Sequence, residues 1–175
     1  AIVLPNGPEM AAAFVACGSA CTAAPLNPAH KEDEFHFYME DLKSSALLVE
    51  RGSRSPAVAA AKRLGIPLLE LIPTAAAGSF AIEGPSIGSA KTMNMAAEDV
   101  ALVLHTSGTT SRPKIVPLTH ANLLASAGNI QKTLTLVSSD RCLNIMPLFH
   151  IHGLVAAILA TLSAGASVCC TPGFN

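Results

Sequence analysis

The sequence predicts an α/β fold in which helices cover a mainly parallel sheet, and two observations lead to this prediction. Continuous apolar runs of strand length alternate along the chain with longer stretches of helical periodicity. Strands that are apolar on both faces are typical of parallel sheets covered by helices. In addition, 50% of the residues are hydrophobic and only 13% are charged. Since about 25% charged residues is usual for a free-standing domain, the chain is expected to be the buried part of something larger.

Strands and helices are expected to alternate through the first half of the chain. Pro8 suits the first turn of a helix, and Gly65 is expected to end a later one. Apolar residues recur at helical spacing between Lys31 and Leu42. The predicted strands are residues 2–4, 46–49 and 66–71, the predicted helices are 8–22, 31–42 and 55–64, and a short extended segment is predicted at 23–26.

The middle of the chain differs from what precedes and follows it. Residues 74–97 are rich in Gly, Ser, Pro, Ala and Met and have no clean period, so an irregular connecting loop is expected there. Order returns at Asp99, and Thr119 is a suitable N-cap for the next helix. The second half should contain strands at 100–105, 115–118, 142–146 and 167–170, and helices at 119–133 and 151–163.

Charge and composition argue against two classes of partner. The formal net charge is −1 and no basic block is present, so nucleic-acid binding is not expected. The longest apolar run, residues 154–170, is interrupted by polar residues and is shorter than the roughly 20 residues that a membrane-spanning helix needs. A membrane span is therefore the less favoured interpretation.

No targeting segment is visible, and a cytoplasmic location is expected, with a peroxisome as the alternative.

The five cysteines lie in apolar patterns and form no CxxC motif, so they are interpreted as small buried thiols in a reducing compartment. Cys17 and Cys21 share the face of a predicted helix. Two ligands alone do not make a metal site, and no metal site is predicted.

A polar run, TSGTTSRPK at residues 106–114, follows a buried strand. Its small side chains let backbone N–H groups approach an anion, and its hydroxyls add further donors. Gly108 allows a sharp turn, and Lys114 can reach a terminal phosphate. These features favour polyphosphate binding, while a solvated Ser/Thr hairpin between two strands is the alternative. The run is not a Walker A loop, because GxxxxGK[ST] is absent.

A second motif, MPLFHIHG at residues 146–153, ends a strand and opens a helix. Backbone N–H groups at a helix start favour an anion, and the imidazoles of His150 and His152 add switchable charge. Alternatively, His150 caps the helix and His152 is a packed surface residue. Metal binding is less favoured, because no third ligand is near.

Both motifs resemble signatures of the acyl-adenylate-forming (AMP-binding) superfamily, the first [ST]SGTTGxPK and the second P[LM]FHxxG. The resemblance implies that residues 1–175 are a fragment of the N-terminal AMP-binding domain, and that the rest of this domain and the C-terminal domain are absent. It assigns two groups of site residues. The ATP phosphates would be bound by Thr106, Ser107, Gly108, Thr109, Thr110 and Lys114, and the acyl-substrate pocket would include His150, His152 and Gly153.

Within this superfamily, the sequence is most similar to the oxalate–CoA ligase (oxalyl-CoA synthetase) branch. The similarity lies in residues 1–9, 24–28 and 34–38, combined with 104–106 and 149–153. The resemblance implies an AMP-forming acid–CoA ligase that uses ATP, Mg²⁺ and CoA, with a small dicarboxylate such as oxalate as the acid. A medium-chain, malonate or aryl acyl-CoA ligase, a carrier-protein-loading adenylation domain and a degenerate nucleotide-binding paralogue are the alternatives.

Several essential parts of this family are missing from the sequence. The run that contacts adenine and magnesium, the ribose-binding Asp and the catalytic Lys have no counterpart here. The Mg²⁺ ligands are therefore expected mostly outside the fragment. No complete catalytic set is present, and the fragment is expected to be inactive alone.

Overall fold

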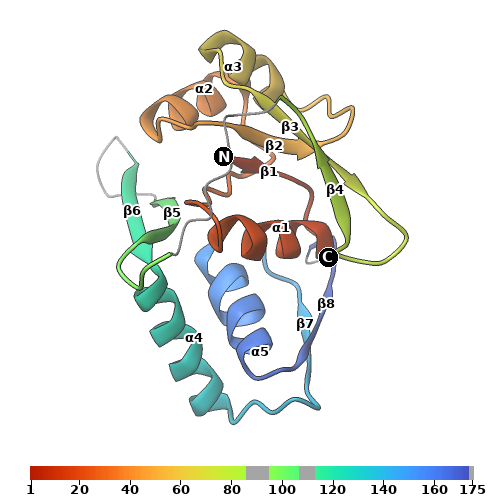
Figure 1. Cartoon of the computed structure of the whole chain (residues 1–175), viewed down its shortest axis with the longest axis vertical. Coiled ribbons are helices and arrows are strands. Elements are labelled where there is room, and N and C mark those ends of the chain that lie inside the picture. The colour runs from red at the N-terminus through yellow and green to blue at the C-terminus, as the bar shows by residue number, and fades with distance from the viewer. Residues whose placement is uncertain (86–94, 107–112, 174–175) are drawn as a thin grey trace.

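The computed structural model describes residues 1–85, 95–106 and 113–173, and it contains three groups of paired strands (Figure 1). The largest sheet has the order β1-β2-β3-β4, with β1–β2 and β2–β3 parallel and β3–β4 antiparallel. β5 and β6 form an antiparallel pair, and β7 and β8 a parallel pair. The bounds are β1 (Ile2–Val3), β2 (Leu47–Glu50), β3 (Leu68–Pro73), β4 (Phe80–Glu83), β5 (Val100–Thr106), β6 (Lys114–Thr119), β7 (Arg141–Asn144) and β8 (Ser167–Cys170).

The predicted extended segment at 23–26 connects two of these sheets. Ala23 pairs with Leu102 of β5, and Pro25 pairs with Ile2 of β1. The N–H of Ile2 donates to the carbonyl oxygen of Ala24, and the N–H of Ala23 donates to that of Ala101, both at 2.9 Å. Main-chain hydrogen bonds therefore link the β5–β6 pair to the edge of the four-stranded sheet.

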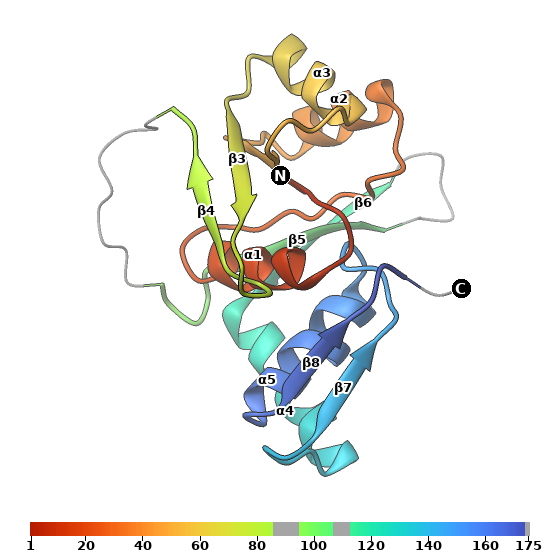
Figure 2. The same cartoon turned by 90° about the vertical axis from the view of Figure 1, so that its right-hand side faces the viewer.

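The helices lie at both ends of the structure and across its middle. α2 and α3 lie together beyond the four-stranded sheet, α1 crosses the middle, and α4 and α5 lie side by side near β7 and β8 (Figures 1 and 2). The bounds are α1 (Pro8–Gly18), α2 (Glu32–Asp41), α3 (Pro56–Leu64), α4 (His120–Leu134), the π-helical η1 (His152–Leu159) and its continuation α5 (Ala160–Ser163). Across the described ranges, no helix is both long and apolar enough to cross a membrane.

Two buried clusters form the core. The larger cluster joins α1 and η1 to the strands and includes Phe14, Leu71, Leu102, Leu148 and Ile158. The smaller cluster lies between α2, α3 and β2 and includes Phe35, Met39, Leu47, Val49 and Ala61. The α/β prediction is confirmed, and three of the five strand pairs in the described residues are parallel.

Local signals placed several helix ends correctly. The hydroxyl of Thr119 accepts from the N–H of Asn122 at 3.2 Å and caps α4. Gly65 ends α3 with a φ of 67°, a left-handed conformation that favours glycine. α1 ends at Gly18, earlier than the predicted boundary at residue 22. The predicted helix at 151–163 forms, but its first part is π-helical.

The prediction of an irregular connection over residues 74–97 needs correction, because β4 lies within it. Three of the four β4 residues are exposed although Phe80, Ala81 and Ile82 are apolar, so the strand lacks the burial that marks β1, β2 and β5. β4 forms through its pairing with β3, in which Leu71 lies opposite Ile82. An ion pair between Arg51 and Glu83 adds a further link. Residues 86–94 of the predicted loop lie outside the described residues.

Candidate functional site

The two sequence motifs meet at one cavity of about 630 Å³. Thr106, which ends β5, and His150, which lies in the turn before η1, both line it. Residues from the segment after α1 and from α2 complete the wall, among them Asn27 and Tyr38. The fold thus brings together one predicted phosphate-binding residue and one predicted acyl-pocket residue.

The rim near Thr106 is the end of a β-hairpin. Thr106 pairs with Lys114 across the β5–β6 ladder, so the first and last residues of the phosphate motif lie opposite each other. Both residues are exposed. Ser107, Gly108, Thr109 and Thr110 lie outside the described residues. A hairpin is compatible with both the phosphate-binding interpretation and the solvated alternative, so it does not distinguish between them.

The rim near His150 is a tight turn. The N–H of His150 donates to the carbonyl oxygen of Pro147 at 3.2 Å, and its own carbonyl accepts from the N–H of Leu154 at 3.1 Å. The Nδ1 atom of His150 accepts from the N–H of His152 at 3.4 Å, although Ile151, rather than His150, is the N-cap of η1. The Nε2 atom is then the ring nitrogen that can serve a ligand.

The other two residues predicted for the acyl pocket occupy different positions. His152 is exposed and does not line the cavity that contains His150. Gly153 is buried, and a Cβ atom added there would collide with the carbonyl oxygen of Pro147. Gly153 therefore allows the start of η1 to pack closely on the turn, which is a structural reason for a glycine at this position.

A group of polar rings in the cavity wall was missed by sequence reasoning. The Nε2 atom of His105 lies 3.0 Å from Oδ2 of Asp41, and its side chain is only 7% exposed. The ring centroid of Tyr38 lies 4.6 Å from that of His105 and 4.8 Å from that of His30. Burial raises the pKa of Tyr38, with Glu34 adding to the shift, which favours the neutral phenol. The signal was weak, because His105 lies within an apolar strand and its partner is on a distant helix.

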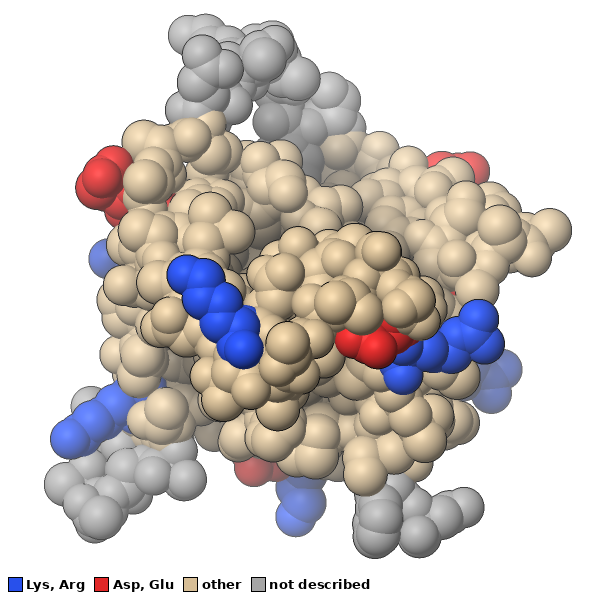
Figure 3. Space-filling view, turned by 90° about the horizontal axis from the view of Figure 1, so that it is seen from below, with Lys and Arg blue, Asp and Glu red and all other residues tan. Residues whose placement is uncertain are grey.

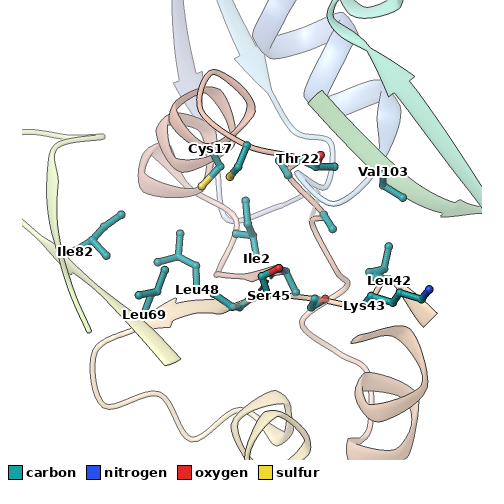
Figure 4. A pocket seen from close by; sticks show the side chains of 16 residues that line it. Ile2, Cys17, Thr22, Leu42, Lys43, Ser45, Leu48, Leu69, Ile82 and Val103 are labelled. Atoms are coloured by element: carbon teal, nitrogen blue, oxygen red, sulfur yellow. Dashed lines mark hydrogen bonds between the residues drawn. The ribbon is translucent and has the colours of Figure 1, made fainter. Parts of the chain in front are cut away.

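A second cavity, of about 440 Å³, contains none of the predicted site residues. Figure 4 shows its largely apolar lining, which includes Ile2, Leu48 and Ile82. Cys17 and Cys21 also line it, and a hydrogen bond between their thiols lowers the pKa of Cys21 to about 6 and raises that of Cys17. None of the residues that line this cavity also lines the cavity at which the motifs meet.

Charged side chains are scattered over the face seen in Figure 3. Blue and red groups lie singly or beside each other, and the described residues form no continuous basic surface on that face. The polar groups of the candidate site are therefore distinguished by their shared cavity rather than by a regional excess of charge.

Comparison with known proteins decides the family. A family described as "AMP-binding enzyme" matches residues 1–175. The chain belongs to this family. An oxalate–CoA ligase of Arabidopsis thaliana is 42% identical over 173 residues, covering 96% of this chain and 34% of the relative. An oxalate–CoA ligase of Saccharomyces cerevisiae is 39% identical over 201 residues, covering 100% and 37%. The chain thus spans about a third of the length of these curated relatives.

Solved structures share the fold. ATP-bound MatB from Rhodopseudomonas palustris aligns with a TM-score of 0.80 and 25% identity, over 99% of this chain and 35% of that one. The o-succinylbenzoate CoA synthetase of Bacillus subtilis, in complex with ATP and magnesium ion, aligns with a TM-score of 0.75 and 25% identity, over 99% and 44%. These matches confirm that the chain has the fold of the N-terminal part of adenylate-forming enzymes.

Proposed function

We propose that the full-length protein activates a carboxylic acid with ATP and then transfers the acyl group to CoA. The observation that carries this proposal is the meeting of Thr106 and His150 at one cavity. In the first step a carboxylate oxygen attacks the α-phosphorus of ATP and pyrophosphate leaves. In the second step the CoA thiol attacks the acyl carbon and AMP leaves. The protein acts mainly by positioning and by stabilising charge.

The hairpin end suits the phosphates of ATP. Thr106 offers a hydroxyl and Lys114 an ammonium group, and their cross-strand pairing presents both at the same end of the ladder. Charged donors form strong hydrogen bonds to phosphate oxygens. We also propose that the neighbouring residues Ser107, Gly108, Thr109 and Thr110 supply hydrogen-bond donors to the phosphates.

Mg²⁺ would neutralise phosphate charge, but the part of the chain that the structure describes contains no group of three His, Cys, Asp or Glu residues placed to hold a metal ion. Its ligands are therefore proposed to lie elsewhere in the full-length protein, and no step is assigned to the metal here.

The imidazoles in the cavity wall favour a small dicarboxylate such as oxalate as the acid. Such a substrate keeps one carboxylate charged while the other reacts, and removing that charge from water is costly unless it is paired. His150 lines the cavity, and its Nε2 atom can donate to that carboxylate. The rings of His30 and His105 also line the cavity, each with one nitrogen facing the carboxylate of Glu34 or Asp41. The names of the oxalate–CoA ligase relatives support this choice. Malonate is the next candidate, because a malonate–CoA ligase of Mus musculus is 33% identical over 153 residues.

ATP–pyrophosphate exchange by the full-length protein tests the proposal. Oxalate, malonate, octanoate and a cinnamate are compared at equal concentrations, and the active acids are then tested for CoA thioester formation. Oxalate is expected to support the fastest exchange. A preference for octanoate or the cinnamate would overturn the dicarboxylate proposal, whereas no exchange with any acid would overturn the ligase proposal itself.

A further inference from the structure

A single asparagine side chain joins distant parts of the chain where their strands end. Asn6 follows β1 and precedes α1. Its Nδ2 atom donates to the carbonyl oxygen of Met146 at 3.2 Å and to that of Thr171 at 3.0 Å, and its Oδ1 atom accepts from the N–H of Leu148 at 2.7 Å. Met146 and Leu148 follow β7, and Thr171 follows β8. Asn6 therefore ties the carboxyl end of β1 to the carboxyl ends of β7 and β8.

The three partners fit the amide group of Asn6 in one orientation only. The two carbonyl oxygens can only accept, and the N–H of Leu148 can only donate. An aspartate of the same shape would place a carboxylate against two carbonyl oxygens. An alanine would leave all three backbone groups without this partner, and unpaired polar groups in a partly buried position are unfavourable.

The segment that Asn6 holds is the one that presents His150. Leu148 is two residues earlier in the same turn, and its side chain is 1% exposed. Asn144 holds the start of the turn, because its Nδ2 donates to the carbonyl oxygen of Met146 and its Oδ1 accepts from the N–H of Met146, both at 3.1 Å. Asn144 belongs to the same segment, so it fixes the local shape of the turn. Asn6 comes from the other end of the chain, so it fixes where the turn lies.

We propose that Asn6 is a positioning residue that sets the place of His150 in the substrate cavity. This inference rests on the proposed function, because His150 matters for turnover only if the cavity takes the carboxylate. Asn6 does not line that cavity and acts through the backbone of the turn. A misplacement of about 1 Å can lower a rate roughly 100-fold. Loss of the three bonds should therefore impair the use of the acid more than it impairs ATP binding.

The test uses the full-length protein and the variants Asn6→Ala and Asn6→Asp, with Leu47→Ala as the control. Leu47 is buried in the smaller core cluster, which includes no residue of the turn, so its truncation is expected to lower stability without a direct effect on His150. For each variant we would measure the melting temperature, the kcat and KM of ATP–pyrophosphate exchange for the acid and for ATP, and the rate at which diethyl pyrocarbonate modifies His150. Peptide mass spectrometry distinguishes His150 from the other histidines.

Below the melting temperature of every variant, Asn6→Ala is expected to lower kcat/KM for the acid about tenfold or more relative to Leu47→Ala. The KM for ATP should change less than about threefold. Asn6→Asp should be at least as impaired, because its carboxylate meets the two carbonyl oxygens. The modification rate of His150 should change in both Asn6 variants and stay at the wild-type value in Leu47→Ala.

If the Asn6 variants behave like Leu47→Ala in kcat/KM for the acid and in the modification of His150, the inference is wrong and Asn6 only stabilises the fold. If the wild-type protein shows no pyrophosphate exchange with any of the acids, the proposed function fails. The modification rate then still decides whether Asn6 positions His150. If Asn6→Ala does not fold, Asn6→Ser takes its place, since its hydroxyl can retain one of the three bonds.

Discussion

The two rims of the candidate cavity are held in different ways. The turn that carries His150 is fixed by side-chain hydrogen bonds from Asn6 and Asn144 to its backbone, and by close packing against Gly153. His150, Thr106 and Lys114 are all exposed, but Thr106 and Lys114 lie at the end of a two-stranded ladder. A small acid must be oriented closely, whereas a polyphosphate can be bound largely through charge. Under the proposed function, the turn is a fixed wall for the acid and the end of the ladder supplies donors for the phosphates.

The largest expected effect comes from removing everything outside residues 1–175. Both rims lie within these residues, but on their own they are expected to show no ATP–pyrophosphate exchange, because a complete catalytic set is expected only in the full-length protein. They should also associate, since Leu124, Leu134 and Leu143 are 67%, 62% and 63% exposed. Exchange assays and sedimentation velocity would measure both properties. Turnover, or a cooperative melt from a monodisperse monomer, would show that the two rims need no further support.

Lys114→Ala tests the rim that is expected to bind phosphate. A hydrogen bond to a charged group contributes about 1.5–3 kcal/mol, so kcat/KM for ATP in the full-length protein should fall roughly 10- to 100-fold. The KM for the acid should change much less. Lys132→Ala, in the last turn of α4, is the matched control that removes a charge elsewhere. Equal kinetics for the two variants would exclude Lys114 from the ATP site.

Gly153→Ala tests the packing of the opposite rim. The added Cβ would collide with the carbonyl oxygen of Pro147, so the turn or the start of η1 must move. Overpacking of this kind costs about 1–3 kcal/mol of unfolding free energy, and kcat/KM for the acid should fall with it. Denaturant titration and exchange kinetics provide the two measurements.

Gly128→Ala is the matched control for Gly153→Ala. Gly128 lies within α4, and nothing is within 4 Å of a Cβ atom added there. Since alanine favours the helix interior by up to about 1 kcal/mol over glycine, this variant should be as stable as the wild type or more stable. If Gly153→Ala were as stable as Gly128→Ala, the turn would adapt easily to the added Cβ atom, and the rim that carries His150 would not be fixed by close packing.

The sequence predicted the features that depend on neighbouring residues. Thr119 caps α4 through Asn122, three positions later, and Gly65 ends α3 because its own backbone needs a positive φ. Both signals are readable in a short window. The phosphate and His150 motifs were also found in this way, and the α/β alternation placed each of them after a strand.

Features that depend on distant partners could not be predicted. β4 exists because β3 offers an edge, although its own residues are mostly exposed. His105 was read as part of a buried strand, and nothing near it in sequence indicates the contact with Asp41. Asn6 looks like an ordinary turn residue until β7 and β8 are placed beside it. Each of these contacts joins segments whose relative position only the folded chain defines.

The smallest effect is expected for His152→Phe, which tests how far the fixed wall extends. The family resemblance placed His150 and His152 in one pocket, but residues at i and i+2 do not face the same side of a helix. In the structure His150 lines the cavity, and the exposed side chain of His152 does not. The bond from His152 to Nδ1 of His150 uses the backbone N–H, which phenylalanine retains. The kcat/KM for oxalate in His152→Phe should therefore stay within about twofold of the wild type, whereas His150→Phe should lose about tenfold or more. A tenfold loss in His152→Phe would mean that its imidazole reaches the acid and that the wall continues into η1.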